Sequence, residues 1–473
     1  MSQNPFKLPI YSGRPANVIS LDRFCITSTH PTAYEDKGET TTNKMLCRKL
    51  RWEQLCRGSA RKQGLSRTSR RYSSDSENYV STASSRHFYQ NSALLDYVSR
   101  KARPVSLQQL MFYGAKLTDE KIIASANFVH QEIPVRIAHR IHDMQSLPYV
   151  VVSNKHISNV YNLYYQSFHA LRKFPIIRTM EDNSRFCDLL NSLLTSHLSV
   201  IPNLVMGVIE CADKIEYKRT DDFMKKMLTS RISRRVIQEQ HIALTDLYLN
   251  KNISRPQGQI GKLYLQLTCG DVVRQCAKLS ASLSNSLHPN HPVPEVLIDG
   301  HENTKISYIE SHLHYILGEI LRNSFEAAIE KYDQELQKPI TVTISDSPVH
   351  VIFRFSDRSG GLPGDIMPYL WSFVKGPRSQ TRLKNFQQVP ALAAIVEELH
   401  GGDQSVLHPE GQKTSSLSGL TTRSPAIRLG MGLPMSRTYA EYWGGKLDVH
   451  SLEGYGCDVF LHISKYGTEL KTT

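Results

Sequence analysis

The chain lacks the patterns that would assign it to a functional class at first sight. Its eight cysteines form no C-x-x-C pair and none has zinc-finger spacing, which favours free thiols in a reducing compartment. No uninterrupted apolar run approaches the ~18 residues of a membrane-spanning helix, so we expect no membrane span. There is no internal repeat, no G-K-[ST] phosphate loop, and neither the H-R-D nor the D-F-G motif of ordinary protein kinases. What remains is a globular chain long enough for about two or three domains.

Acidic residues are scarce in one segment, and this scarcity accounts for most of the net charge. The chain carries 57 Lys and Arg against 44 Asp and Glu, a net charge of +13, which at first suggests a nucleic-acid partner. Residues 45–72, however, hold nine of the basic residues and a single acid, a net charge of +8, and residues 1–44 carry +1. The rest of the chain is left with +4, so we expect no nucleic-acid partner.

The basic segment 45–72 has the composition of a mitochondrial targeting sequence. It is rich in Arg, contains Ser and is almost free of acids, and its apolar residues are interleaved with basic ones. A candidate cleavage point lies between Tyr72 and Ser73. Because such sequences begin a chain, Met45 is an alternative start, and a disordered basic tail is the alternative interpretation. We assign residues 1–94 to an N-terminal extension with a polar leader and expect a mature protein in the mitochondrial matrix.

Residues 95–255 have the apolar periodicity of α-helices. Apolar side chains recur at intervals of about three and four residues, and the joints between the periodic stretches carry Pro, Gly or Asn. The expected helices cover residues 106–114, 120–148, 156–174, 185–215 and 221–250. Long helices joined by short connections predict an antiparallel helical bundle.

Residues 256–466 combine helical periodicity with alternating strands. Helices are expected at residues 271–287 and about 308–333, and strands at residues 294–299, 340–347, 349–357, 446–451 and 457–464. This mixture predicts an α/β sandwich after the bundle, and hence a two-domain protein of class α followed by α/β. Residues 403–425 are expected to form a polar loop, and residues 467–473 a C-terminal tail.

The expected helix at residues 308–333 carries a stripe of polar side chains. Glu319, Asn323, Glu326 and Glu330 are spaced by four, three and four residues, so they lie along one side of the helix. The opposite side is apolar. Taken alone, the stripe is best interpreted as a solvated face, although Asn is a poor residue in the middle of a helix.

Three glycine-containing turns follow this helix. A strand runs into Asp357 and breaks at Gly360 and Gly361, an arrangement that suits binding of an amino group beside a flat ring; an ordinary Asp turn is the alternative. Gly430 and Gly432 precede a helix expected to begin near residue 433 or 434, where backbone N–H groups can face an anion. A further hairpin contains glycines at residues 454 and 456. Each turn alone is a modest signal.

The order of these four features is specific. A helix with Glu-x-x-x-Asn, a strand with Asp-x-x-Gly-Gly, a Gly-x-Gly at a helix start and a glycine hairpin resemble the four boxes of the GHKL, or Bergerat-type, ATP-binding fold. The bundle segments "FVHQEIPVRIAHRI" and "LTSRISRRVIQEQHIAL" closely resemble those of pyruvate dehydrogenase kinases and the related branched-chain 2-oxoacid dehydrogenase kinase. The resemblance covers residues 106–463. A bacterial-type histidine kinase is disfavoured because "HQEIPVR" lacks H-E-x-x-T-P.

The resemblance implies an ATP- and Mg²⁺-dependent protein-serine kinase and a role for each matching residue. Glu319 is implied as the general base on the substrate serine, and Asn323 as the Mg²⁺ ligand. Asp357 is implied to receive the adenine amino group. The implied ATP-binding residues are Glu319, Asn323, Glu326, Asp357, Gly361, Leu362, Gly430, Met431, Gly432 and Leu433.

The resemblance also implies partners. The substrate would be the E1α subunit of pyruvate dehydrogenase, and the bundle would dock the lipoyl domain of the E2 core. A homodimer is expected by analogy. His197, Arg231 and Arg235 match a bundle site for small regulatory carboxylates, with bundle salt bridges as the alternative. Two other functions stay open: a branched-chain 2-oxoacid dehydrogenase kinase, and a catalytically weak ATP-binding scaffold that docks on E2.

Several positions depart from the family pattern and indicate a divergent fungal member. Tyr315 holds the place of a His four residues before the base, and Glu326 adds an acid near the expected phosphates, unless it faces Mg²⁺ or Arg322. Leu194 replaces a basic residue of the carboxylate site, and Cys457 replaces a common Thr.

Overall fold

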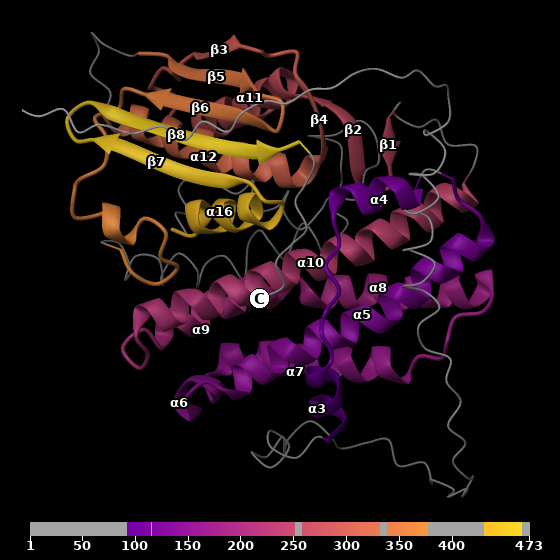
Figure 1. Ribbon diagram of the computed structural model, residues 1–473. Helices are drawn as coiled ribbons and strands as arrows, with labels where there is room; N and C mark the ends of the chain where they lie inside the picture. The colour runs from indigo at the N-terminus through magenta and orange to yellow at the C-terminus, as the bar shows by residue number, and fades with distance from the viewer. Residues whose placement is uncertain (1–91, 115, 251–257, 332–337, 377–429, 466–473) are drawn as a thin grey trace, which may run out of the picture. The chain divides into compact units, whose positions relative to one another are not determined.

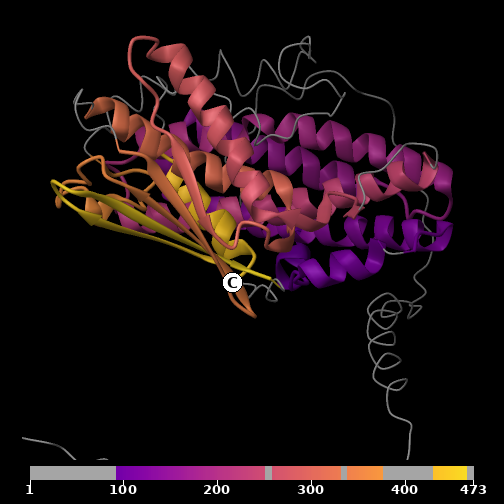
Figure 2. The same ribbon diagram turned by 90° about the horizontal axis from the view of Figure 1, so that it is seen from above.

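A helical bundle followed by an α/β sandwich makes up the described part of the chain, seen from two sides in Figure 1 and Figure 2. The structure is a computed structural model and describes residues 92–114, 116–250, 258–331, 338–376 and 430–465. All of these residues belong to one compact unit, Ser69–Thr473. The expected targeting segment, the polar loop at residues 403–425 and the C-terminal tail lie outside the described residues.

Long helices packed side by side form the bundle. The elements are α3 (Ser92–Ser99), α4 (Leu107–Gly114), α5 (Asp119–Gln145), α6 (Tyr149–Val152), α7 (Lys155–Lys173), α8 (Met180–Ser196), η1 (His197–Ser199), α9 (Val200–Glu210) and α10 (Tyr217–Leu249). Helix α5 packs against α7 and α10, and α7 packs against α9. The predicted helical bundle is therefore confirmed.

Side-chain caps set the starts of three of these helices. Thr118 accepts a hydrogen bond from the Lys121 backbone N–H at the start of α5, and Asn154 caps α7. Thr179 and Asp182 form a reciprocal capping box at the start of α8. Because the first backbone N–H groups of a helix have no partner within it, each cap stabilises its helix start, typically by about 1 kcal/mol.

The single helix expected at residues 185–215 is wrong. The structure divides it into α8, the short 3₁₀ turn η1, and α9. Pro202 explains the break: it has no N–H to donate to the carbonyl of Leu198, and its ring would clash there, so a new helix starts just before it.

By length and composition, one segment of the described chain, Met180–Glu210, is apolar enough to cross a membrane, but half of its apolar window is buried within the bundle.

A polar cluster is buried where α5, α8 and α10 meet. His241 on α10 lies 3.0 Å from the Ser125 hydroxyl through Nδ1 and 3.7 Å from the Cys187 sulfur through Nε2. Burial lowers the pKa of His241 to about 4, and it raises the pKa of the Cys187 thiol to about 11. Both groups are therefore neutral near neutral pH, which suits an interior position.

The depressed pKa of His241 makes stability depend on pH. The unfolded chain takes up the proton near the ordinary pKa of 6.5, whereas the folded protein resists it until about 4. The free energy of unfolding therefore keeps its full value above the pKa of His241 in the unfolded chain, and it falls as the pH drops toward the pKa in the folded protein. The free energy of unfolding is measured by urea unfolding at about pH 7 and at about pH 5. Between these two conditions it should fall by roughly 2 kcal/mol more in the unchanged protein than in His241→Gln. Equal losses in the two proteins would contradict this.

The sandwich is built on a five-stranded mixed sheet. Its strands are β3 (Val296–Gly300), β5 (Ile340–Asp346), β6 (His350–Asp357), β8 (Gly456–Ser464) and β7 (Lys446–Leu452), side by side in that order. Strand β3 pairs with β5 in parallel, and the other pairs are antiparallel. Helices α11 (Cys269–Leu287), α12 (Glu310–Glu330) and α16 (Gly432–Tyr442) pack on one face of the sheet (Figure 1). The predicted α/β sandwich is confirmed.

A small second sheet was not expected. It consists of β1 (Gln259–Ile260), β2 (Leu263–Thr268) and β4 (Lys305–Ile309), paired antiparallel. Strand β4 occupies residues at which the helix was expected to begin, so α12 starts at Glu310 instead. The pairing joins residues about forty positions apart along the chain, and such long-range pairing leaves little local signal in two short strands.

The bundle meets the sandwich chiefly through α10 and α16. Glu441 on α16 forms an ion pair with Lys225 on α10, at 2.7 Å. The backbone N–H of Phe373, just after the 3₁₀ turn η2 (Met367–Tyr369), donates to Asp221 on α10 at 2.8 Å. Helix α16 is thus held between the sheet of the sandwich and the longest helix of the bundle.

Candidate active site

Helix α12 presents Glu319 to the interior and Asn323 to the surface. Glu319 is 1% exposed, although it begins the polar stripe, whereas Asn323 one turn later is exposed and Glu326 is half-buried. The interpretation of the stripe as a uniformly solvated face is therefore wrong for Glu319. The apolar side of the helix, including Leu317 and Leu321, is buried as expected.

Arg322 and Gly432 both lie against the Glu319 carboxylate. Arg322 donates from Nη2 to Oε1 at 2.5 Å, and its side chain is also buried, with Arg322 4% exposed. The other oxygen, Oε2, faces Gly432 so closely that a Cβ at Gly432 would overlap it. Because only glycine leaves this space, the close approach of α16 to the carboxylate depends on Gly432.

The Gly-x-Gly turn opens α16. Gly430 has a positive φ of 65°, Met431 precedes the helix, and Gly432 is its first residue, one or two positions before the expected start near residue 433 or 434. Within the described part of the chain, the N-cap residue Met431 gives no side-chain hydrogen bond to the first N–H groups of α16. A helix start of this kind favours an anion, because the free N–H groups and the positive end of the helix dipole face it.

Asp357 ends strand β6 and is 6% exposed. Its Oδ1 accepts a hydrogen bond from the Ser359 backbone N–H at 3.1 Å, and its Oδ2 accepts one from the Ser324 hydroxyl of α12 at 3.4 Å. Burial raises the pKa of this carboxyl above its usual range. A desolvated carboxylate on the wall of a site is a strong acceptor for an amino group of a ligand.

The turn after Asp357 packs directly on the glycine hairpin between β7 and β8. Gly361 has a φ of 68°, and a Cβ there would overlap the Leu452 carbonyl oxygen. The Gly454 N–H donates to the Gly360 carbonyl at 2.8 Å, and the Leu362 N–H donates to the Ser451 hydroxyl at 2.6 Å. The two turns therefore form one continuous backbone surface beside Asp357.

These features fit a nucleoside triphosphate with its metal. Asp357 and the glycine surface suit an adenine ring, and the start of α16 suits phosphate groups. In the described ranges, no three His, Cys, Asp or Glu side chains gather to hold a metal ion. At nucleotide sites Mg²⁺ is usually held largely by phosphate oxygens and water, with one or two protein ligands.

Sequence reasoning missed the contact between Arg322 and Glu319. It considered Arg322 only as a partner of Glu326, whereas the structure pairs it with Glu319 at i,i+3 spacing. That spacing was a visible signal. Tyr315, at the position of the family's His, is buried in the core, and its hydroxyl lies 3.6 Å from the sulfur of Met435 on α16.

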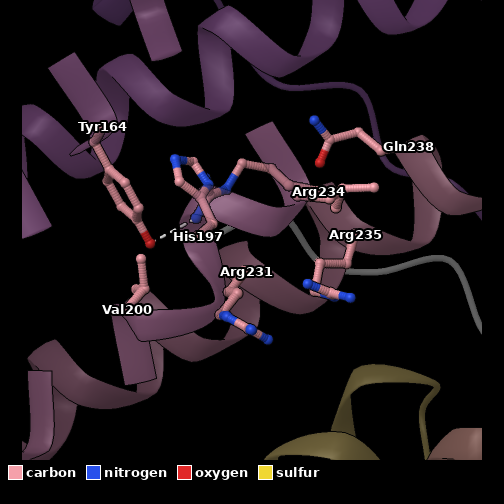
Figure 3. A pocket seen from close by; sticks show the side chains of 8 residues that line it. Tyr164, His197, Val200, Arg231, Arg234, Arg235 and Gln238 are labelled. Atoms are coloured by element: carbon pink, nitrogen blue, oxygen red, sulfur yellow. Dashed lines mark hydrogen bonds between the residues drawn. The ribbon is translucent and has the colours of Figure 1, made fainter. Parts of the chain in front are cut away.

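The second predicted group of residues meets in a pocket of the bundle (Figure 3). His197, Arg231 and Arg235 line it together with Tyr164, Leu194, Val200, Arg234 and Gln238. Arg234 was missed by the sequence reasoning. It donates to the Tyr164 hydroxyl at 2.6 Å and lies over the Tyr164 ring at 4.4 Å.

The pocket is positively charged and not fully hydrogen-bonded. Arg231 is 3% exposed, and its Nε and Nη1 have no hydrogen-bond partner among the described residues. Burial and the neighbouring Arg235 lower the pKa of Arg231 to about 10, so it stays charged. Burial, followed by Arg234, lowers the pKa of His197 to about 3, so its imidazole is neutral. Arg235 forms an ion pair with Glu239 at 2.5 Å.

The arrangement would suit a bound anion. The salt-bridge alternative describes Arg235, which has a carboxylate partner. It does not describe the buried Nε and Nη1 of Arg231, whose lack of a partner is costly unless a ligand satisfies them. In Figure 3 the side chains of Arg231 and Arg235 point toward the yellow ribbon of the sandwich.

Comparison with known proteins gives the same two parts. Residues 104–263 match the family of mitochondrial branched-chain alpha-ketoacid dehydrogenase kinase, and residues 308–467 match the histidine kinase-, DNA gyrase B- and HSP90-like ATPases. The chain is 35% identical to mitochondrial pyruvate dehydrogenase (acetyl-transferring) kinase 2 of Saccharomyces cerevisiae, over 86% of this chain and 89% of that protein. It is 27% identical to the mitochondrial kinase of the same name from Arabidopsis thaliana, over 78% and 92%. It is 25% identical to human isozyme 4, over 77% and 82%. The chain belongs to the family of mitochondrial pyruvate dehydrogenase kinases.

Proposed function

We propose that the protein is an ATP-dependent protein-serine kinase that phosphorylates, and thereby inactivates, the E1α subunit of the mitochondrial pyruvate dehydrogenase complex. The observation that carries this proposal is the buried Glu319 carboxylate, which faces the start of α16. A base is thereby placed beside the expected phosphate site, as transfer to a serine requires. The relatives, named as kinases of pyruvate dehydrogenase, supply the substrate.

Each residue of the site has a distinct task. Glu319 accepts the proton of the substrate serine, and the start of α16, with Gly430, Met431, Gly432 and Leu433, binds the transferred phosphate through backbone N–H groups. Asp357 fixes the adenine amino group, and Gly361 and Leu362 lie beside the ring. Glu326 lines the same helix face. Positioning and charge stabilisation account for most of the catalysis of phosphoryl transfer.

Asn323 is the proposed protein ligand of Mg²⁺. Its side chain is neutral, so the full charge of the metal would act on the phosphates, where it offsets the charge that develops during transfer. The exposed position of Asn323, one turn beyond Glu319, supports this role.

One assay separates the candidate functions. The protein is incubated with labelled ATP, Mg²⁺ and either the purified pyruvate dehydrogenase or the branched-chain 2-oxoacid dehydrogenase complex. Label on the pyruvate dehydrogenase E1α alone is the expected result. Label on the branched-chain E1 alone would favour the second candidate, which the family match of the bundle supports. Nucleotide binding without any label would identify a scaffold and refute the kinase.

We propose the mitochondrial matrix as the location. The relatives are named mitochondrial, and residues 45–72 have a targeting composition, although they lie outside the described residues. N-terminal sequencing of the mature protein should give a start near Ser73, and an intact Met1 would refute cleavage.

We assign residues 95–255 to E2 docking and regulation and residues 256–466 to ATP binding and transfer. Exposed Phe112 and Leu249 on the bundle support docking of a lipoyl domain, because exposed large apolar side chains favour protein contacts. Co-sedimentation with the isolated lipoyl domain of E2 would test it. Light scattering would test the expected homodimer.

The arginine pocket is proposed to bind a small regulatory carboxylate. The buried, unpartnered Nε and Nη1 of Arg231 support this, since a carboxylate accepts two N–H bonds from one guanidinium. In Arg231→Gln, inhibition by pyruvate should require at least about tenfold more ligand, whereas kcat without ligand should change less than about twofold.

Lys226→Gln serves as the control because Lys226 is exposed on the same helix. The melting temperature of Arg231→Gln should not fall, since the substitution removes a buried charge. Unchanged pyruvate inhibition in this folded variant would leave the arginines as structural groups of the bundle.

A further inference from the structure

We propose that Arg322 is a positioning residue for the base: it fixes one oxygen of Glu319 so that the other faces the start of α16. The inference rests on the proposed kinase function. It is carried by the contact between Arg322 and Glu319, by the burial of both side chains, and by the close approach of Gly432.

The two carboxylate oxygens of Glu319 have different surroundings. Oε1 accepts a hydrogen bond from Arg322 Nη2 at 2.5 Å, whereas Oε2 lies against the α-carbon of Gly432. A carboxylate held by a charged hydrogen bond through one oxygen cannot rotate freely about its terminal torsion. Arg322 therefore determines which oxygen is presented to the phosphate site.

Arg322 and Glu319 are both shielded from water, so the contact between them can fix the orientation of the carboxylate. Their side chains are 5% and 1% exposed, and they lie one turn apart on α12. An exposed ion pair of this spacing would contribute little to the orientation of either partner. In the interior, the guanidinium compensates the negative charge of the buried carboxylate.

On the other side of Glu319 along α12, the neighbouring residue is the uncharged Tyr315. Tyr315, one turn before Glu319, lies with its ring 5.4 Å from that of Tyr439 on α16, and its hydroxyl contacts the Met435 sulfur. Tyr315 thus packs α12 against α16. The cation that contacts the carboxylate comes from the following turn, at Arg322.

A double-mutant cycle tests whether Arg322 acts through Glu319 or contacts the phosphates directly. Arg322→Met and Arg322→Lys are made in the unchanged enzyme and in Glu319→Gln. Three quantities are measured: kcat for labelled phosphate transfer, KM for ATP, and the Kd of a fluorescent ADP analogue without substrate. Arg274→Met, an exposed residue of α11, is the matched control.

If Arg322 acts through Glu319, Arg322→Met lowers kcat about thirtyfold, while KM for ATP and the Kd for ADP stay within about threefold. Arg322→Lys recovers most of the loss because it restores the charge. In the Glu319→Gln background, Arg322→Met changes the residual rate less than about twofold, because no carboxylate remains to be oriented.

Two results would overturn the proposal. An equal loss from Arg322→Met in both backgrounds would show that Arg322 does not act through the base. An ADP affinity weakened more than about tenfold would identify a phosphate contact instead. Circular dichroism and melting temperatures show whether the variants are folded. If Arg322→Met does not fold, the same comparison is made with Arg322→Lys. If the unchanged enzyme binds ADP but labels neither complex, the kinase function itself fails, and this role fails with it.

Discussion

Replacing Glu319 by glutamine is expected to lower kcat for phosphate transfer about 10³-fold, while the Kd for ADP changes less than about threefold. Glutamine has nearly the same size and can still accept a hydrogen bond from Arg322, so the packing between α12 and Gly432 is preserved. It cannot accept the proton of the serine. Transfer of labelled phosphate under single-turnover conditions measures the chemical step directly.

The matched control is Glu330→Gln. Glu330 lies on the same stripe of α12, but it is exposed and far along the helix from the start of α16. Its substitution should leave kcat within about twofold. Loss of a general base usually lowers the rate about 10²- to 10⁴-fold. If the Glu319→Gln enzyme retains a tenth or more of the rate, Glu319 is not the base.

Replacing Asp357 by alanine is expected to weaken ADP binding about 100-fold. The carboxylate is buried and its pKa is raised by desolvation, so it gains strongly from an amino group that approaches it. Removing it leaves the adenine amino group without its acceptor. Titration of a fluorescent ADP analogue, competed by unlabelled ADP, gives the affinity.

Inosine diphosphate makes this test specific, because it carries an oxygen where ADP carries the amino group. The unchanged protein should prefer ADP, and Asp357→Ala should bind the two with affinities within about threefold. Asp448→Ala, on strand β7 of the same sheet, should retain the preference. A preference that survives in Asp357→Ala would show that another group reads the adenine.

The sequence predicted the architecture because apolar periodicity is local. The strand ending at Asp357 and the helix carrying Glu319 follow from spacings of two and of three to four residues. The break at Pro202 was equally local but was overlooked within a long apolar stretch. The small sheet depends on pairing between residues far apart in the chain, which no local pattern reveals.

The site was predicted less completely than the fold. A helical wheel shows that Glu319 and Glu330 share a side, but it cannot show that the first is buried and the second exposed. That difference arises because α16, more than 100 residues later, packs on the first half of α12, from His312 to Glu319. Arg234 was missed because its partner, Tyr164, is fixed by packing, whereas the i,i+3 spacing of Arg322 and Glu319 was a local signal that was overlooked. The roles assigned to the site residues, including Asn323 and Glu326, stay predictions.

The position of α16 has a thermodynamic consequence. Its first residue lies against Glu319, while its later residue Tyr439 lies within electrostatic reach of Arg231 and Arg235 in the bundle. One helix therefore contacts Glu319 at its start and interacts electrostatically with the arginines of the pocket farther along. If an anion in the pocket changes the affinity for ADP by some factor through α16, ADP must change the affinity for that anion by the same factor. Measuring either affinity with and without the other ligand would thus give the coupling free energy between the two domains.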